Sequence, residues 1–282
     1  MTVLVTGSRG QLGAALLAEA ARRRLAAEGH DLDTLDIADP VAVERTVLRV
    51  RPSVIVNCAA MTDVDRCESE PDAANRINGL AVGNLARAAD LAGAVLVQVS
   101  TDYVFPGTGS RPWAEDDPVD PVNAYGRSKA LGESLARTAR RHLVVRTAWL
   151  FGPGGRNFVE AILRQVESGA RTLDVVADQR GCPTYAPDLA GAILDLLARG
   201  ATGTIHVVNA GSTTWHGFAR AIVARTAPGV AVRPVPTEAF PRPARRPANS
   251  VLATDRLRRL LGRELPPWEN ALDRDLEARC AS

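Results

Sequence analysis

Lysine is nearly missing from this 282-residue chain, and several other residue types are scarce. Among 34 Lys and Arg residues only Lys129 is a lysine, and aromatic residues make up 4% of the chain. No hydrophobic run approaches the ~18 residues that a membrane-spanning helix requires. The four cysteines are scattered without the spacing of a metal site or of a disulfide framework. These absences argue against a membrane protein and against a disulfide-stabilised secreted domain, and they predict a cytoplasmic protein with reduced thiols.

Charge is also close to balanced. The formal net charge is +2, and the arginines are spread along the chain without a long basic run. This distribution does not favour nucleic-acid binding. The first residues, "MTVLVTG", lack the basic and apolar regions of a secretory signal. We therefore expect neither a nucleic-acid partner nor a membrane partner.

Short apolar runs alternate with longer helix-type segments through the first half of the chain. "TVLVTG", "SVIVNCAA" and "AVLVQVS" are separated by segments such as "QLGAALLAEAARR". This alternation is typical of βαβ units around a parallel sheet, and strands without period-two alternation are covered by helices on both faces. The prediction for residues 1–150 is an α/β, doubly wound parallel sheet (Rossmann), with a helix from about Ser128 to Arg140 and then a strand, "HLVVRTAWLFG".

Beyond residue 150 the local composition changes. Gly and Pro cluster at "FGPGG", "DQRGCPT" and "FPRPARRP". These clusters predict a smaller, interleaved C-terminal substrate-binding domain over residues 151–282. Within it, "YAPDLAGAILDLLARG" predicts a helix near 187–199 that packs back on the main sheet.

A glycine-rich loop follows the first expected strand. "VTGSRGQLG" places Gly7, Gly10 and Gly13 before the first expected helix. In this GxxGxxG spacing the glycines permit a tight turn, close approach of the backbone to a pyrophosphate and close helix-to-strand packing. The helix N-terminus adds free N–H groups and a partial positive charge. Because the motif opens a βαβ unit, it predicts a dinucleotide site.

The choice between NADH and NADPH depends on the residue at the end of the second strand, where an acid favours a free ribose hydroxyl. "EGHDLDTLDIADP" offers Asp36 as the residue that ends the expected strand, with Asp31 as a rival. Arg9, inside the glycine loop, could instead pair with a 2′-phosphate. The sequence is therefore consistent with either NADH or NADPH as the cofactor.

Tyr125 and Lys129 lie four residues apart in "NAYGRSKALGE", which is one helical turn on the same face. A phenol with a pKa near ~10 is a poor acid, and an adjacent cation favours its phenolate. A compact ammonium suits this position better than a planar guanidinium, because it can contact a nicotinamide ribose while it places a point charge near the phenol. Because the chain uses arginine at every other cationic position, the lysine at position 129 indicates that Tyr125 and Lys129 form a catalytic pair.

A polar cluster, "STDY", follows the strand at Val95–Val99. Ligands of open α/β sheets bind outside the carboxyl ends of the strands. The Thr101 hydroxyl could therefore hydrogen-bond the reacting carbonyl oxygen beside Tyr125.

The glycine loop, "STDYVFPG" and "YGRSK" together resemble the extended short-chain dehydrogenase/reductase superfamily. "RPSVIVNCAAMTDVDRCESEP", "RTAWLFG", "ADQRGCPT", "STTWHGFA" and "RRPANSVLAT", in this order, narrow the resemblance to the dTDP-4-dehydrorhamnose reductase family, over residues 1 to about 270. The resemblance implies reduction of a 4-keto group on a dTDP-linked 6-deoxyhexose by NADPH or NADH.

The resemblance also implies roles for residues that match the family's motifs. The catalytic residues are Thr101, Tyr125 as proton donor, and Lys129. The cofactor-binding residues are Gly10, Gln11 and Leu12, then Asp36 and Ile37, then Ala60, Met61 and Thr62. The substrate-binding residues are Asp102, Trp149, Gln179, Thr184, Arg246 and Asn249. Trp215 joins them on chemical grounds, because a nucleoside diphosphate needs cations and aromatic platforms.

Two departures from the family's pattern stand out. Some relatives bind a metal at a dimer interface through glutamates, where this chain has Ala15 and, near Thr184, Pro187 and Asp188. We therefore expect no metal, and a monomer or a weak homodimer. Met61 also stands where histidine is common in the family.

Rival functions share much of this pattern. A dehydratase would need a second carboxyl group after Asp102, where this chain has Tyr103. An epimerase would return the hydride to its substrate and would not consume added NAD(P)H. A 4-ketoreductase for another dTDP-deoxysugar, and a non-catalytic regulatory subunit that binds dinucleotide, remain as alternatives.

Overall fold

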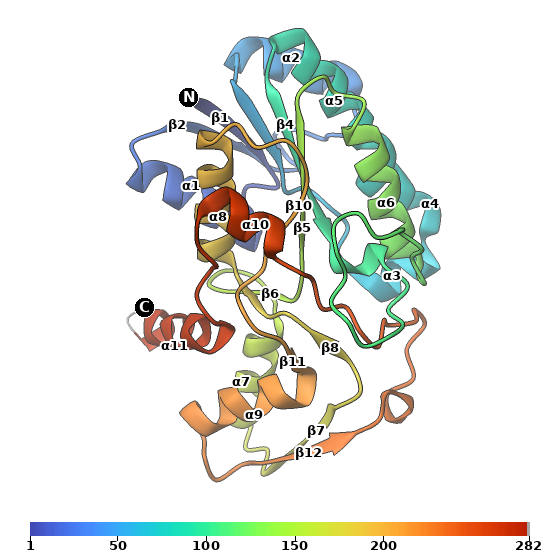
Figure 1. Cartoon of the computed structure of the whole chain (residues 1–282), viewed down its shortest axis with the longest axis vertical. Helices are drawn as coiled ribbons and strands as arrows, with labels where there is room; N and C mark the ends of the chain where they lie inside the picture. The colour runs from blue at the N-terminus through green and yellow to red at the C-terminus, as the bar shows by residue number, and fades with distance from the viewer. Residues whose placement is uncertain (281–282) are drawn as a thin grey trace.

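A six-stranded sheet forms the centre of the larger domain in the computed structural model, which describes residues 1–280 (Figure 1). Its strand order is β2-β1-β3-β4-β5-β10, and every neighbouring pair is parallel. The strands are β1 (Thr2–Thr6), β2 (Ala26–His30), β3 (Val54–Asn57), β4 (Val95–Thr101), β5 (His142–Thr147) and β10 (Gly203–His206). The predicted α/β doubly wound parallel sheet is confirmed.

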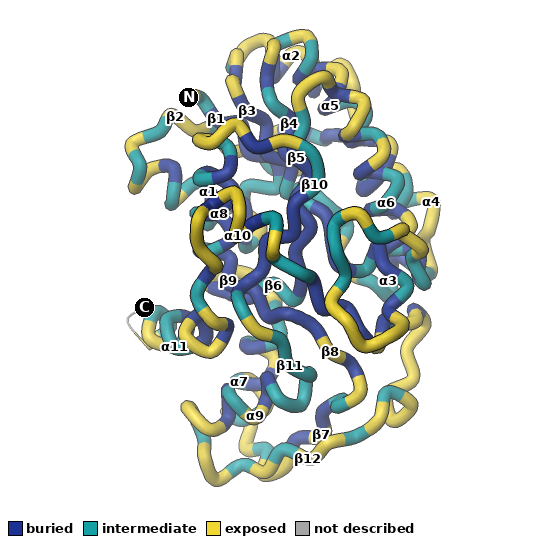
Figure 2. Tube along the Cα trace, in the orientation of Figure 1, coloured by how far each residue is buried: buried dark blue, intermediate teal, exposed yellow. Residues whose placement is uncertain are grey.

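Helices cover both faces of this sheet. One face carries α1 (Gln11–Arg22), α8 (Ala186–Ala198) and α10 (Asp255–Leu261), and the other carries α2 (Pro40–Val50), α5 (Ala81–Ala92) and α6 (Ala124–Ala136). Val3 and Val5 pack with the first group, whereas Leu4 between them packs with the second. Side chains alternate across a strand, so a sheet covered on both faces reads as a continuous apolar run. Strands β1, β3, β4 and β5 are mostly buried, whereas the edge strand β2 is largely exposed (Figure 2).

The strand order places a crevice at the carboxyl ends of the strands. The chain moves from β1 to β2 on one side and then crosses to β3 on the other side of β1. Because the loops after β1 and β3 leave the sheet in opposite directions, ligands of such folds bind at this point.

The second half of the chain contributes to both domains. It supplies α8, β10 and α10 to the larger domain, and sequence patterning did not indicate β10. The smaller lobe contains β6 (Leu150–Phe151), α7 (Phe158–Glu167), β7 (Thr172–Val176), β8 (Arg180–Gly181), β9 (Thr184–Tyr185), β11 (Thr213–Thr214), α9 (Trp215–Thr226), β12 (Ala231–Val235) and α11 (Trp268–Cys280). Its core is rich in aromatic side chains, including Phe151, Phe218 and Trp268. Within residues 1–280, no helix has the length and apolar character needed to cross a bilayer.

Two predicted element boundaries were wrong. Helix α6 begins at Ala124, not at Ser128, because Asn123 caps it: the Asn123 Oδ1 accepts a hydrogen bond from Gly126 N at 2.8 Å. The strand after residue 142 stops at Thr147, and Trp149 then takes a left-handed conformation with φ of 45°. This break sends the chain out of the large sheet and into β6, which pairs with β9.

Candidate active site

The glycine loop between β1 and α1 has no room for larger residues. Gly7 has a positive φ of 64°, and a Cβ on it would lie 2.6 Å from Ala59 N. A Cβ on Gly13 would lie 2.2 Å from Gly7 O. Both clashes are with backbone, which cannot move aside as a flexible side chain can. The loop therefore lies directly against the α1 N-terminus and the segment after β3.

The N-terminus of α1 fits a dinucleotide phosphate. Its N-cap is Gly10, and no side chain caps the helix. Leu12 is a core residue, so only its backbone N–H is left for a ligand. The Gln11 Nε2 donates to Gly152 O at 3.0 Å and so ties the loop to the smaller lobe. A glycine cradle that a Cβ would fill, beside an uncapped helix, is the geometry that accepts a pyrophosphate.

Gly13→Ala tests this cradle. We expect the dissociation constant for NADPH to rise about tenfold and the Tm to fall, because overpacking against fixed backbone costs about 1–3 kcal/mol. Isothermal titration calorimetry and a thermal melt measure the two effects. Gly229→Ala is the matched control, since its Cβ would meet no atom within 4 Å. Unchanged NADPH affinity in Gly13→Ala would show that the cradle does not touch the cofactor.

The acid at the end of β2 is Asp31, and the assignment of Asp36 to that position is corrected. Strand β2 ends at His30, so Asp31 follows it directly, and Asp31 Oδ2 accepts from Arg9 N of the glycine loop at 3.0 Å. Asp36 lies in the next loop, where its Oδ1 accepts from Ala38 N. Because this segment contains several aspartates, the sequence pattern did not show which of them follows the end of the strand.

The neighbours of these acids also have defined places. The Arg9 guanidinium pairs with Asp33 rather than standing free, with an Nη2–Oδ1 distance of 2.6 Å. Ile37 is 4% exposed and belongs to the core beneath α2 and α5. Ala60, Met61 and Thr62 form the loop that follows β3. Met61 and Tyr125 both pack against the buried cluster of Cys67, Ala74 and Ala124, so this loop borders helix α6 as well as the glycine loop.

The Lys129 side chain is buried between helix α6, which carries both Tyr125 and Lys129, and strand β4. It is 4% exposed, and its Nζ donates to Val99 O of β4 at 2.6 Å. An ammonium has three donors, and within residues 1–280 only this one has a hydrogen-bond partner. Burial lowers the pKa of Lys129 to about 8, although the Glu133 charge opposes this shift. The amine thus has two N–H groups left for a ligand and carries its charge near neutral pH.

Tyr125, Thr101 and Asp102 meet at the carboxyl end of β4. Thr101 Oγ1 donates to Asp102 Oδ1 at 2.9 Å and accepts from Tyr103 N at 3.2 Å. Asp102 is 2% exposed, and its Oδ2 has no hydrogen-bond partner within the described part of the chain. Because buried polar atoms are normally hydrogen-bonded, this oxygen is suited to a ligand hydroxyl.

Burial dominates the ionisation of this cluster. It raises the pKa of Asp102 to about 6 and raises the pKa of Tyr125, to which the Asp102 charge adds. Desolvation therefore favours the protonated phenol over the phenolate. The phenol therefore keeps its proton at neutral pH, and a nearby positive charge such as that of Lys129 would be needed to make it a better acid.

Two buried residues that sequence reasoning missed hold this arrangement. Asn78, in the π-helical segment η1 (Asn75–Leu80), donates to Met61 O and to Ser128 Oγ, each at 3.0 Å. Glu133, one turn after Lys129, accepts from Ser100 Oγ at 2.7 Å and pairs with the buried Arg146. A polar residue within an apolar helical segment was the only sequence signal for either.

The smaller lobe brings Trp149 and Trp215 together. Their rings are stacked with centroids 3.5 Å apart and planes 4° apart, and both side chains are half-buried. A Cβ on Gly181 would lie 2.3 Å from the Trp149 ring, so glycine makes room for the indole. Trp149 is a non-glycine residue with a positive φ. Such a backbone conformation is strained, and strained residues cluster at ligand sites.

Three other residues that were predicted to bind the substrate make hydrogen bonds to groups of the protein itself. Thr184 is fully buried, and its hydroxyl donates to Cys182 O. Gln179 donates to Thr237 Oγ1, and Asn249 Nδ2 donates to Arg111 O at 2.8 Å. Through these bonds Thr184 and Asn249 hold neighbouring loops in place.

Arg246 pairs with Asp65 from the larger domain. The guanidinium lies end-on to the carboxylate, with Nη1–Oδ1 at 2.9 Å and Nη2–Oδ2 at 3.0 Å. Asp65 belongs to α3 (Val64–Ser69), in the segment after β3. This pair joins the two domains close to Tyr103 and Tyr125.

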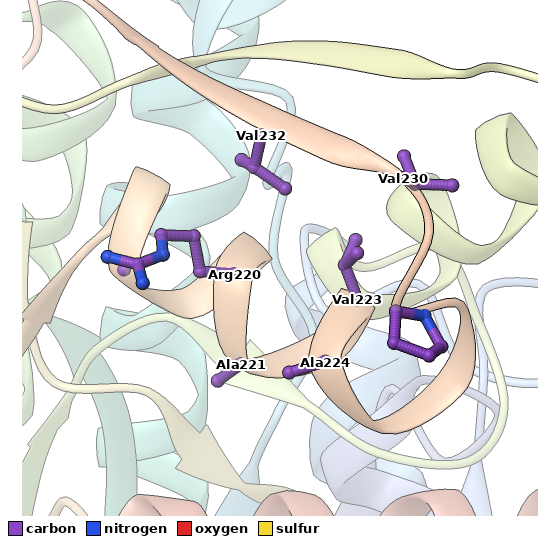
Figure 3. A pocket seen from close by; sticks show the side chains of 8 residues that line it. Arg220, Ala221, Val223, Ala224, Val230 and Val232 are labelled. Atoms are coloured by element: carbon purple, nitrogen blue, oxygen red, sulfur yellow. The ribbon is translucent and has the colours of Figure 1, made fainter.

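A hollow of about 480 Å³ lies elsewhere, between α9 and β12 (Figure 3). Figure 3 shows Val223, Val230 and Val232 around it, and none of its lining residues is a predicted site residue. Within residues 1–280, no group of three or more His, Cys, Asp and Glu side chains is arranged to hold a metal ion.

Comparison with known proteins identifies the family. The family model described as RmlD substrate binding domain matches residues 1–280. A dTDP-4-dehydrorhamnose reductase of Burkholderia thailandensis is 44% identical, over 96% of this chain and 97% of that protein. A probable dTDP-4,6-dihydroxy-2-methyloxan-3-one 4-ketoreductase of Streptomyces antibioticus is also 44% identical, over 96% and 93%.

Solved structures agree with the sequence relatives. The dTDP-4-dehydrorhamnose reductase of Bacillus anthracis, solved in complex with NADP, superposes with a TM-score of 0.95 at 38% identity, over 98% of this chain and 99% of that one. The resemblance drawn from the motifs is confirmed: this chain belongs to the RmlD substrate binding domain family, the family of the dTDP-4-dehydrorhamnose reductases.

Proposed function

We propose that this protein uses NADPH or NADH to reduce the 4-keto group of a dTDP-4-dehydro-6-deoxyhexose, converting dTDP-4-dehydro-L-rhamnose to dTDP-L-rhamnose. The observation that carries the proposal is the placement of Tyr125, Lys129, Thr101 and Asp102 at the carboxyl end of β4, beside a glycine cradle that fits a dinucleotide. Full-length similarity to named dTDP-4-dehydrorhamnose reductases supports the substrate class.

Tyr125 is the proton donor in this proposal. Reduction of a ketone to an alcohol adds a hydride at carbon and a proton at oxygen. The reduced nicotinamide supplies the hydride when it is bound. Tyr125 gives its hydroxyl proton to the carbonyl oxygen, and the Lys129 charge eases this transfer, because burial alone makes the phenol a weaker acid.

The neighbouring residues hold and polarise the carbonyl. The Thr101 hydroxyl lies beside Asp102 and can turn to donate to the developing alkoxide. Asp102 Oδ2 accepts from a sugar hydroxyl. The two free N–H groups of Lys129 hold a ribose hydroxyl and place a positive charge near the phenol as it loses its proton.

The domains divide the ligands between them. The larger domain, over residues 1–150 with α8, takes the dinucleotide, and residues 151–282 mainly take the nucleotide-sugar. The stacked pair Trp149–Trp215 and the Arg246 cation supply the platform and the charge that a nucleoside diphosphate needs.

The partners and the compartment are also proposals. Ala15 replaces a glutamate that some relatives use at a metal-linked interface, which supports a monomer or a weak homodimer without a metal. Within the described residues all four cysteines are free, which supports the reducing cytoplasm.

A single assay tests this function. Purified protein is mixed with dTDP-4-dehydro-L-rhamnose and either NADPH or NADH, nicotinamide absorbance is followed, and the sugar is identified by NMR. We expect absorbance to fall only when the sugar is present, with dTDP-L-rhamnose as the product. Sugar conversion without net NAD(P)H consumption would indicate an epimerase, and dinucleotide binding without turnover would indicate a regulatory subunit.

A second candidate is a 4-ketoreductase for another dTDP-deoxysugar. The similarity to the Streptomyces antibioticus protein favours it, because that relative is as similar in sequence as the Burkholderia reductase. The assay with a different dTDP-4-keto sugar distinguishes the two through the ratio of kcat/KM values.

A further inference from the structure

The pair formed by Asp65 and Arg246 has features beyond those of a surface ion pair. The side chains of Arg246 and Asp65 are 14% and 25% exposed. By contrast, the pair Arg233–Asp174 in the smaller lobe is 66% and 39% exposed. A largely buried pair that spans two domains restricts both partners, whereas an exposed one contributes little.

Several hydrogen bonds fix the segment that carries Arg246. Asp65 Oδ1 also accepts from Ala244 N at 3.2 Å, and Asp65 Oδ2 lies 3.3 Å from Nη1 of Arg242. From the other side, Asn123 Nδ2 donates to Arg245 O at 2.8 Å. Asn123 is the N-cap of the helix that carries Tyr125. The arginine segment is therefore anchored on α3 and on the catalytic helix together.

One edge of the Arg246 guanidinium is left without a partner. Nη1 donates to Asp65 and to Ala244 O, and Nη2 donates to Asp65. Within residues 1–280, Nε and the second hydrogen of Nη2 make no hydrogen bond. This edge is not fully buried, since the side chain is 14% exposed, and it is therefore available to a ligand. That edge has the two-donor geometry that matches a phosphate oxygen pair.

The position and charge of the pair agree with an anionic ligand near the catalytic residues. Arg246 is close enough to Tyr103 to act on the ionisation of its phenol, and the Tyr103 ring lies edge-on to Tyr125 with centroids 5.9 Å apart. Arg242 and Arg246 together outweigh the single charge of Asp65, so the cluster keeps a net positive charge.

We propose that Asp65 is a positioning residue for the diphosphate of the nucleotide-sugar: it binds Arg246 end-on and thereby presents the free edge of the guanidinium to the phosphate oxygens. This inference rests on the proposed function and deepens it. Asp65 itself touches neither substrate nor cofactor.

Asp65→Asn tests the proposal, because asparagine keeps the shape of the side chain and removes its charge. Calorimetry measures the dissociation constants of dTDP and of thymidine, which lacks the diphosphate. We expect dTDP to bind about tenfold more weakly in the variant, with thymidine affinity unchanged. KM for the sugar nucleotide should rise by a similar factor, while kcat changes little. Asp174→Asn is the matched control and should leave dTDP binding unchanged.

A double-variant cycle separates positioning from a general defect. If Asp65 acts through Arg246, then Asp65→Asn has no further effect on dTDP binding once Arg246→Gln is present. Equal losses for dTDP and thymidine, unchanged dTDP binding, or tighter dTDP binding, which would mark Asp65 as a competitor of the phosphate, each overturn the inference. Wild-type protein that binds neither dTDP nor thymidine would refute the proposed function itself, and the inference would fail with it.

Discussion

Tyr125→Phe lowers kcat at least ~100-fold, while the dissociation constant for NADPH and the Tm stay close to wild type. Phenylalanine keeps the ring that packs against the buried cluster of Cys67, Ala74 and Ala124 and that lies edge-on to Tyr103. It removes only the hydroxyl that donates the proton. Steady-state kinetics with saturating cofactor and sugar measure the effect.

Tyr103→Phe is the matched control for this variant. Tyr103 is the neighbouring phenol, with a ring centroid 5.9 Å from that of Tyr125, and we assign it no part in proton transfer. Its variant should keep kcat near wild type. If Tyr125→Phe reduces the sugar at the wild-type rate, another group donates the proton and the role given to Tyr125 is wrong.

Replacing Lys129 has the second large effect. Lys129→Met should lower kcat at least ~100-fold, because it removes both the positive charge near the phenol and the N–H groups left for a ribose hydroxyl. Lys129→Arg should also be slow, although charge is kept, because a planar guanidinium does not fit the buried position that donates to Val99 O. Wild-type turnover in Lys129→Arg would show that the single lysine of this chain has no special role.

The pH dependence of Lys129 separates catalysis from stability. Burial lowers its pKa from 10.5 to about 8, so the wild-type enzyme should lose kcat as the pH rises above about 8. In the unfolded chain the same lysine keeps its proton up to its ordinary pKa. Between these two pKa values the unfolded state therefore binds more protons, and the contribution of Lys129 to the free energy of unfolding rises with pH.

Activity and the Lys129 contribution to stability are thus expected to change in opposite directions above pH 8. A kcat profile and urea unfolding curves over the same pH range, for wild type and Lys129→Met, measure both. The difference in stability between the two proteins should shift in favour of wild type as the pH rises. A parallel fall of activity and of this stability difference would mean that the Lys129 pKa is not lowered by burial.

Local pattern was enough to predict the first half of the fold and the central residues of the site. Apolar runs without alternation indicated strands covered on both faces, and the packing of Val3, Leu4 and Val5 on opposite faces shows the reason. The glycine spacing and the Tyr125–Lys129 spacing depend on residues within one turn or one loop. Such features are encoded by neighbouring positions, so they are readable without tertiary structure.

Segments that pair across long separations were not readable in this way. Strand β10 joins the main sheet beside β5, although residues 148–202, which include β6 to β9 of the smaller lobe, lie between them in the chain. Two residues of β6 and two of β9 are too few to show a periodicity. Their pairing is decided by where the strained Trp149 sends the chain.

The sequence by itself therefore determined the sheet type, the dinucleotide loop and the family, because each depends on short-range spacing or on motifs in order along the chain. Tertiary structure alone decided that Asp31 rather than Asp36 ends β2, and that Thr184 and Asn249 support loops. It also decided that Asp65 meets Arg246, from positions 181 residues apart. A side chain's partner depends on contacts between distant segments, and those contacts exist only once the two domains have folded together.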